Sequence, residues 1–171
     1  SVPVSNYVAD YLPLSIGLRS NTGTLRLIGD YERNHFFFTG AAAYTLRSNI
    51  TIDRDQYYTT ELHNTNKVDM PDVATFHVRL GYRGRELGAE AVFTNMTTLG
   101  GFDITRNNMP FPSNRMNATT AGIGLKYNAR ALPGLSVMAG AGYVVKGRNV
   151  GQSTMYNGGV FFVFDLGRKA K

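Results

Sequence analysis

The sequence predicts an all-β fold, an up-and-down arrangement of antiparallel strands, and three observations lead to this prediction. First, segments of about ten residues alternate apolar and polar side chains, which is the period of a strand with two unlike faces. Second, Asn, Gly and Pro recur between these segments, where turns need them. Third, the 171 residues include 19 Gly, 10 Tyr and 10 Phe but no Cys. No apolar run approaches the length of a membrane helix, and no disulfide or Cys-ligated metal site is possible.

About eight strands follow from the alternation. We expect them at residues 11–20, 24–32, 35–47, 74–82, 85–95, 117–127, 135–146 and 155–166. From residue 48 on, the connections alternate between long and short, with long loops at 48–73 and 96–116 and short turns at 83–84 and 128–134. All long loops therefore lie at one end of the strands. We expect three parts: an N-terminal lead at 1–10, the strands at 11–166, and a basic tail at 167–171.

The final segment carries the most specific pattern. Its even positions place Tyr156 early and Phe162 and Phe164 late on one face. This segment resembles the terminal strand of bacterial outer-membrane β-barrels, although those proteins usually stop on the aromatic residue. The resemblance extends over nearly the whole chain as a class. It implies a transmembrane antiparallel up-and-down β-barrel in the outer membrane of a Gram-negative cell, with short periplasmic turns and long external loops.

Aromatic residues on the apolar face fall into two groups, one near the short turns and one near the long loops. Amphipathic rings are favoured where lipid tails meet water, so two belts on a lipid-facing surface have a physical cause. The face carries no charge between the belts, whereas a soluble barrel would direct its charges outward. The belt residues are Tyr31, Phe36, Tyr82, Tyr127 and Phe164 near the turns, and Tyr44, Phe76, Phe93, Tyr143 and Tyr156 near the loops.

The opposite face of the strands is polar. In an eight-stranded barrel this face fills a narrow lumen, so charges on it must pair or be hydrated. We expect an internal ion-pair network of Arg26, Asp30, His77, Arg79, Glu90 and Lys126. A two-residue turn at Arg83-Gly84 would place His77 directly across from Glu90, with Arg79 one diagonal step away.

Few residues suggest bound groups or chemistry. His77 with Glu90 is the one pairing that suggests a general base, and structural pairing is the preferred interpretation, so no catalytic residue is assigned. The Asp53-Arg54-Asp55 segment lacks the spacing of a calcium loop, and no metal or cofactor is predicted. The net charge is +6, but the Lys and Arg residues are scattered along the chain, which argues against nucleic-acid binding.

We expect a non-enzymatic envelope protein: an anchor, an accessory subunit or a surface-recognition module. Its expected contacts are membrane lipid, lipopolysaccharide and an envelope protein partner reached through loops 48–73 and 96–116. The second loop is unusually apolar and includes Phe102, Arg106, Phe111 and Arg115. Because no leader precedes Ser1, the chain could also be the C-terminal portion of a larger porin-like barrel that transports small solutes. A membrane-embedded hydrolase and a soluble β-sandwich are the remaining alternatives.

Overall fold

A computed structural model of the chain describes residues 19–104 and 111–164. Within these ranges the secondary structure consists of strands alone. None of the described segments is a helix long and apolar enough to cross a membrane. The strands are β1 (Thr22–Arg33), β2 (Phe36–Arg47), β3 (Ile50–Thr51), β4 (Tyr57–Tyr58), β5 (Leu62–His63), β6 (Lys67–Val68), β7 (Asp72–Arg83), β8 (Leu87–Leu99), β9 (Asn117–Asn128), β10 (Leu135–Arg148) and β11 (Thr154–Phe162).

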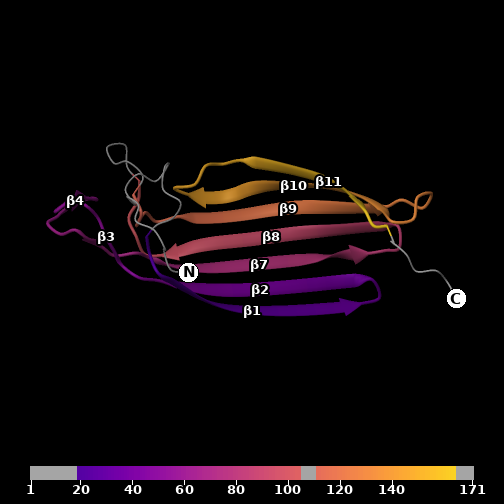
Figure 1. The fold of residues 1–171 in the computed structure, drawn as a ribbon, viewed down its shortest axis with the longest axis horizontal. Helices are drawn as coiled ribbons and strands as arrows, with labels where there is room; N and C mark the ends of the chain where they lie inside the picture. The colour runs from indigo at the N-terminus through magenta and orange to yellow at the C-terminus, as the bar shows by residue number, and fades with distance from the viewer. Residues whose placement is uncertain (1–18, 105–110, 165–171) are drawn as a thin grey trace.

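The seven long strands form one sheet in the order β1-β2-β7-β8-β9-β10-β11 (Figure 1). Every neighbouring pair in this sheet is antiparallel. The paired strands also follow one another in the chain, except that the short strands β3 to β6 lie between β2 and β7. The all-β up-and-down prediction is therefore confirmed. Strands β1 and β11 are the two edges, and among the described strands the sheet is not closed into a barrel. The expected strand at 11–20, apart from Arg19 and Ser20, and the segments 1–10 and 167–171 lie outside the described residues.

Strand β8 is longer than the alternation predicted. Its pairing with β7 continues past Asn95 as far as Leu99, which lies opposite Asp72. The second long connection therefore begins at Gly100 rather than at Met96. Its first two residues, Gly100 and Gly101, have positive φ angles of 126° and 80°, which favour glycine, so the strand ends where the sequence supplies residues that can turn.

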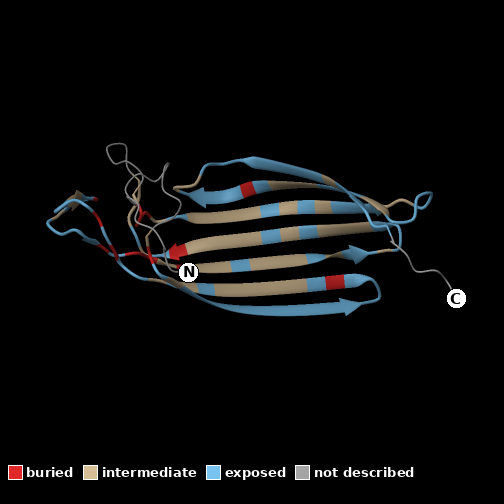
Figure 2. Cartoon of the chain, viewed as in Figure 1, coloured by how far each residue is buried: buried red, intermediate tan, exposed pale blue. Residues whose placement is uncertain are grey.

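The apolar face of the sheet is its exposed face. Leu27 is 69% exposed, Ile123 is 62% exposed and Val137 is 44% exposed, so these side chains do not meet in a dry core. Figure 2 shows that few residues of the long strands are buried. The opposite, polar face is the more enclosed one: on β2, β7 and β8 its residues are mostly half-buried while their apolar neighbours are exposed. An open sheet with this distribution has no hydrophobic core of its own.

The buried apolar cluster of the described residues lies instead in the first long connection. Ile50, Ile52, Val68 and Met70 pack together, each at most 6% exposed. Two small ladders organise this connection, β3 with β6 and β4 with β5, and they lie beyond the end of the sheet (Figure 1). The first long connection therefore has short β structure of its own.

Candidate functional site

One ion pair lies at the centre of the polar face. Arg79 on β7 and Glu90 on β8 approach to 2.5 Å between Nη2 and Oε2, with 38% and 29% of their side chains exposed. Glu90 lies directly opposite Gly81, one diagonal step from Arg79, which is within reach of two long side chains. The sequence also predicted that Arg79 lies one diagonal step from Glu90, but in a register that placed His77, not Gly81, opposite Glu90.

The predicted pairing of His77 with Glu90 is wrong. Arg83 pairs with Gly88, so four residues, Gly84 to Leu87, lie between the last paired residues, and Tyr82 pairs with Ala89 instead of Arg85. His77 therefore faces Thr94, and its Nδ1 lies 3.0 Å from the Thr94 hydroxyl. The register differs from the predicted one by an even number of residues, which leaves every side chain on its predicted face.

The other members of the predicted network lie apart from this ion pair. Asp30 on β1 accepts a hydrogen bond from the Thr39 hydroxyl on β2. Arg26 lies opposite Ala43 on the same pair of strands. Lys126 lies on β9 between Gly88 and Met138. Within the described residues, Arg79 and Glu90 are thus the two of the six predicted residues that the structure joins by an ion pair.

Phe37 is a residue of this face that sequence reasoning missed. It is 5% exposed and lies beneath two guanidinium groups, with Arg83 Cζ 4.1 Å and Arg79 Cζ 5.8 Å from its ring centroid. Such contacts attract a cation to the ring face. Arg83 also pairs with Glu32 at 2.7 Å. The run Phe36-Phe37-Phe38 hides the alternation, but strict counting would have placed Phe37 on the polar face.

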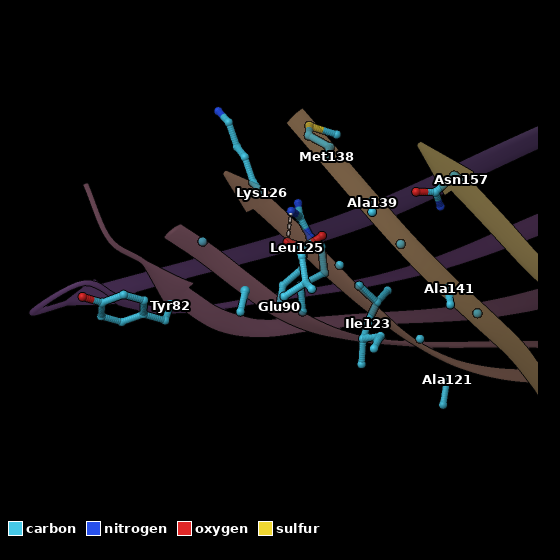
Figure 3. A pocket seen from close by; sticks show the side chains of 18 of the residues that line it. Tyr82, Glu90, Ala121, Ile123, Leu125, Lys126, Met138, Ala139, Ala141 and Asn157 are labelled. Carbon is cyan, nitrogen blue, oxygen red and sulfur yellow. Dashed lines mark hydrogen bonds and ion pairs between the residues drawn. The ribbon is translucent and has the colours of Figure 1, made fainter. Parts of the chain in front are cut away.

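Glycines keep part of the polar face open. A Cβ at Gly124 would lie 3.0 Å from Glu90 Cγ, so the Glu90 side chain lies across a position without a side chain. Gly124 pairs with Gly140, and Gly122 pairs with Gly142. A hollow of about 590 Å³ results, with Glu90, Lys126, Met138 and Asn157 along it. Figure 3 shows Lys126 and Met138 directed to the opposite side of the strands from Ala121 and Ile123.

All ten predicted belt residues are exposed. The group near the turns ranges from Tyr82 at 40% to Phe164 at 65%, and the group near the loops from Tyr44 at 40% to Tyr156 at 81%. Some of these rings touch one another: Phe36 and Tyr82 form an edge-to-face pair with centroids 5.4 Å apart. Large exposed aromatics on one face of a sheet require an apolar environment or a partner to cover them.

The two long connections pack together into what we call the loop assembly, residues 48–71 and 100–104 with 111–116. The Phe111 ring stacks on Tyr57 with centroids 5.2 Å apart and packs against the buried cluster around Val68. Phe102 lies 5.9 Å from Phe111, and the Arg115 amide donates to the Phe102 carbonyl at 2.8 Å. Burial raises the pKa of the Tyr57 hydroxyl. Of the predicted loop residues, Arg106 lies outside the described residues.

A third connection, between β10 and β11, is tied to the loop assembly. Arg148 contacts the Asp103 carboxylate through two nitrogens, with the Nε–Oδ1 distance 2.8 Å. Asn149 donates to Asp103 at 2.9 Å and to the Arg115 carbonyl at 2.6 Å. These donors, Arg148 first, hold the pKa of Asp103 below its ordinary value. The base of the first connection is closed by Asp72, which accepts from the Arg47 amide at 2.9 Å.

No group of three or more His, Asp or Glu side chains in the described ranges could hold a metal ion. Comparison of the chain with protein-family models, with curated proteins and with solved structures found no match in any of the three. The class that the fold defines is an all-β protein with an antiparallel up-and-down sheet, an exposed apolar face and a structured loop assembly at one end.

Proposed function

We propose that this chain is a non-enzymatic β-barrel protein of the bacterial outer membrane. Its barrel anchors it in the envelope, and its loop assembly acts as a surface-recognition module or as an accessory subunit of an envelope complex. Membrane lipid and lipopolysaccharide surround the barrel, and a protein partner binds through residues 48–73 and 96–116.

The observation that carries this proposal is the exposure of the apolar face. Soluble monomers rarely leave apolar patches larger than a few hundred Å² uncovered. Here Leu27, Phe76 and Ile123, each more than half exposed, belong to a face that extends over all seven strands. A bilayer covers such a face, and the flanking exposed rings suit the two lipid–water interfaces.

We propose that the segment 11–20 closes the barrel as an eighth strand. Its alternating Leu12, Leu14, Ile16 and Leu18 match the exposed apolar face of the sheet. The chain enters β1 at the long-loop end, where the Ser20 hydroxyl donates to the Ser48 carbonyl at 2.6 Å. A strand ending there runs antiparallel to β1 and to β11, so it satisfies both open edges of the sheet.

The internal packing of the loop assembly supports the recognition role. Loops of this length that pack around their own buried residues are more often functional than slack. The assembly has such residues in Ile50, Ile52, Val68 and Met70. A surface held in one conformation loses less entropy when a partner binds.

Refolding tests the proposal directly. The purified chain should fold from urea only in the presence of detergent micelles or lipid vesicles, and infrared dichroism of oriented bilayers should give strands tilted by about 35–45°. A monomer that stays folded and soluble without detergent would establish the soluble β-sandwich instead. Deleting residues 100–112 should abolish partner capture while leaving insertion intact.

The hollow on the polar face favours a second candidate, porin-like transport within a larger barrel. The glycine pairs Gly124–Gly140 and Gly122–Gly142 leave space there. If additional strands widened the lumen, Arg79, Glu90 and Lys126 would line a solute path and their charges would set its selectivity. Planar-bilayer recordings separate the candidates, because a narrow eight-stranded barrel filled by side chains should be nearly silent.

A further inference from the structure

The turns opposite the loop assembly form one continuous surface, which we call the short-turn rim: residues 32–36, 82–87 and 126–135. Asn34 and His35 have positive φ angles of 49° and 73°, the geometry of a tight two-residue hairpin. The Arg83 amide donates to the His35 carbonyl at 2.7 Å. The Asn128 amide donates to the Glu86 carbonyl at 2.7 Å. Three separate turns are thus held together by hydrogen bonds.

The rim has more cations than its own carboxylates can pair with. Glu32 is paired with Arg83 at 2.7 Å, and Glu86 with Arg130 at 3.5 Å. Arg33, Arg85 and Lys126 remain, and no carboxylate among the described residues lies within ion-pair distance of any of the three. Arg33 and Arg85 have the sequence parity of the apolar face, whereas Lys126 lies on the polar face.

Exposed rings lie directly beside these cations on the apolar face. Phe36 is 64% exposed and Tyr127 is 47% exposed, and Phe36 contacts Tyr82 edge to face. In a membrane, rings of this kind sit where acyl chains meet head groups. Arg33 ends β1 opposite Phe36, and Arg85 lies in the turn between β7 and β8. Both are then at the level of the phosphates, for which the guanidinium group provides paired donors.

We propose that the short-turn rim binds anionic phospholipid head groups, with Arg33 and Arg85 contacting phosphate oxygens. The inference rests on the proposed function, since it requires the apolar face to lie in a bilayer. Beyond the proposed function, the inference states that the protein prefers anionic lipids and that the short-turn end of the barrel is responsible for this preference.

The test compares urea-driven unfolding of the full chain in vesicles of zwitterionic phosphatidylcholine with unfolding in vesicles containing one third phosphatidylglycerol. A cation near an anionic surface contributes about fivefold to an equilibrium constant, so two contribute roughly 25-fold. We expect the folding equilibrium constant to rise with phosphatidylglycerol, and most of the rise to be lost in the double variant Arg33→Gln/Arg85→Gln. The matched control Lys67→Gln/Lys146→Gln removes two exposed cations from the loop end and should keep the rise.

Two failures are distinguishable. If the chain inserts into both kinds of vesicle with equal stability, or if both double variants lose the rise equally, the rim does not select anionic lipid and the membrane proposal is untouched. If the chain inserts into neither, the membrane proposal fails and this inference fails with it.

Discussion

A positive charge placed at the middle of the exposed apolar face separates a lipid-facing surface from a solvated one. Ile123 is 62% exposed and lies four residues from Tyr127, about 13 Å along a strand. In a bilayer, Ile123→Arg should lower the free energy of unfolding by about 2–4 kcal/mol, which is the cost of an arginine near the midplane. That cost corresponds to roughly a 30- to 900-fold change in the folding equilibrium constant.

Leu87→Arg is the matched control for this prediction. Leu87 is on the same face and 53% exposed, but it begins β8 at the short-turn end. There the cost should be only about 0–1 kcal/mol, because the side chain reaches the interface. The assay is reversible urea unfolding in short-chain phosphatidylcholine vesicles, followed by circular dichroism. If both variants changed stability by less than about 0.5 kcal/mol, as for ordinary surface substitutions, the lipid-facing assignment would be refuted.

Three further predictions concern the loops and the edges. Phe111→Ala removes the ring that stacks on Tyr57, so the local opening free energy of residues 50–70 should fall by roughly 0.5–1.5 kcal/mol or more in hydrogen exchange, while the unfolding midpoint of the sheet stays constant. The pKa of Asp103 lies below its ordinary value of 3.8, so its contribution to loop stability is complete above that pH and is lost as the pH falls through the lowered pKa. Hydrogen-exchange protection around Asn149 should therefore be constant from pH 7 to 5 and drop in stronger acid. The variant Asp103→Asn lacks this titration and should remove the acid-dependent drop. A drop that persisted in this variant would contradict the assignment to Asp103. Because the chain has no Cys, closure by segment 11–20 can be tested with introduced disulfides. One Cys replaces Ser15 or Gly17 and a second replaces Asn157 or Gly159, which gives four pairs, and a disulfide in any pair would report closure. Its absence from all four pairs after insertion would argue against an eighth strand there.

The alternation of side chains predicted the faces of the sheet because its period of two is fixed by backbone geometry. The exposed apolar face and the half-buried polar face follow the sequence at Leu27, Phe76 and Ile123. Register was less predictable, since it depends on how many residues a turn uses. A two-residue turn at Arg83-Gly84 predicts Glu90 as the partner of His77, whereas the longer turn in the structure makes Thr94 its partner.

The loop assembly was the least predictable part. Its buried residues are pairs, Ile50 with Ile52 and Val68 with Met70, separated by a polar stretch, so no local periodicity marks them as a core. The contribution of Phe111 comes from a different connection and depends on tertiary contact alone. Gly100 and Gly101 follow the true end of β8 and have positive φ angles, but the alternation alone placed that end at Asn95.

The base of the first connection has a practical meaning. Arg47 and Asp72 end and begin neighbouring strands and are joined by a hydrogen bond from the Arg47 amide to the Asp72 carboxylate, so the intervening residues leave and re-enter the sheet at adjacent points. An insert with its own interior and closely spaced ends behaves as a cassette. We therefore expect that this insert can be replaced by another one with equally close ends without altering the strand pairing below it.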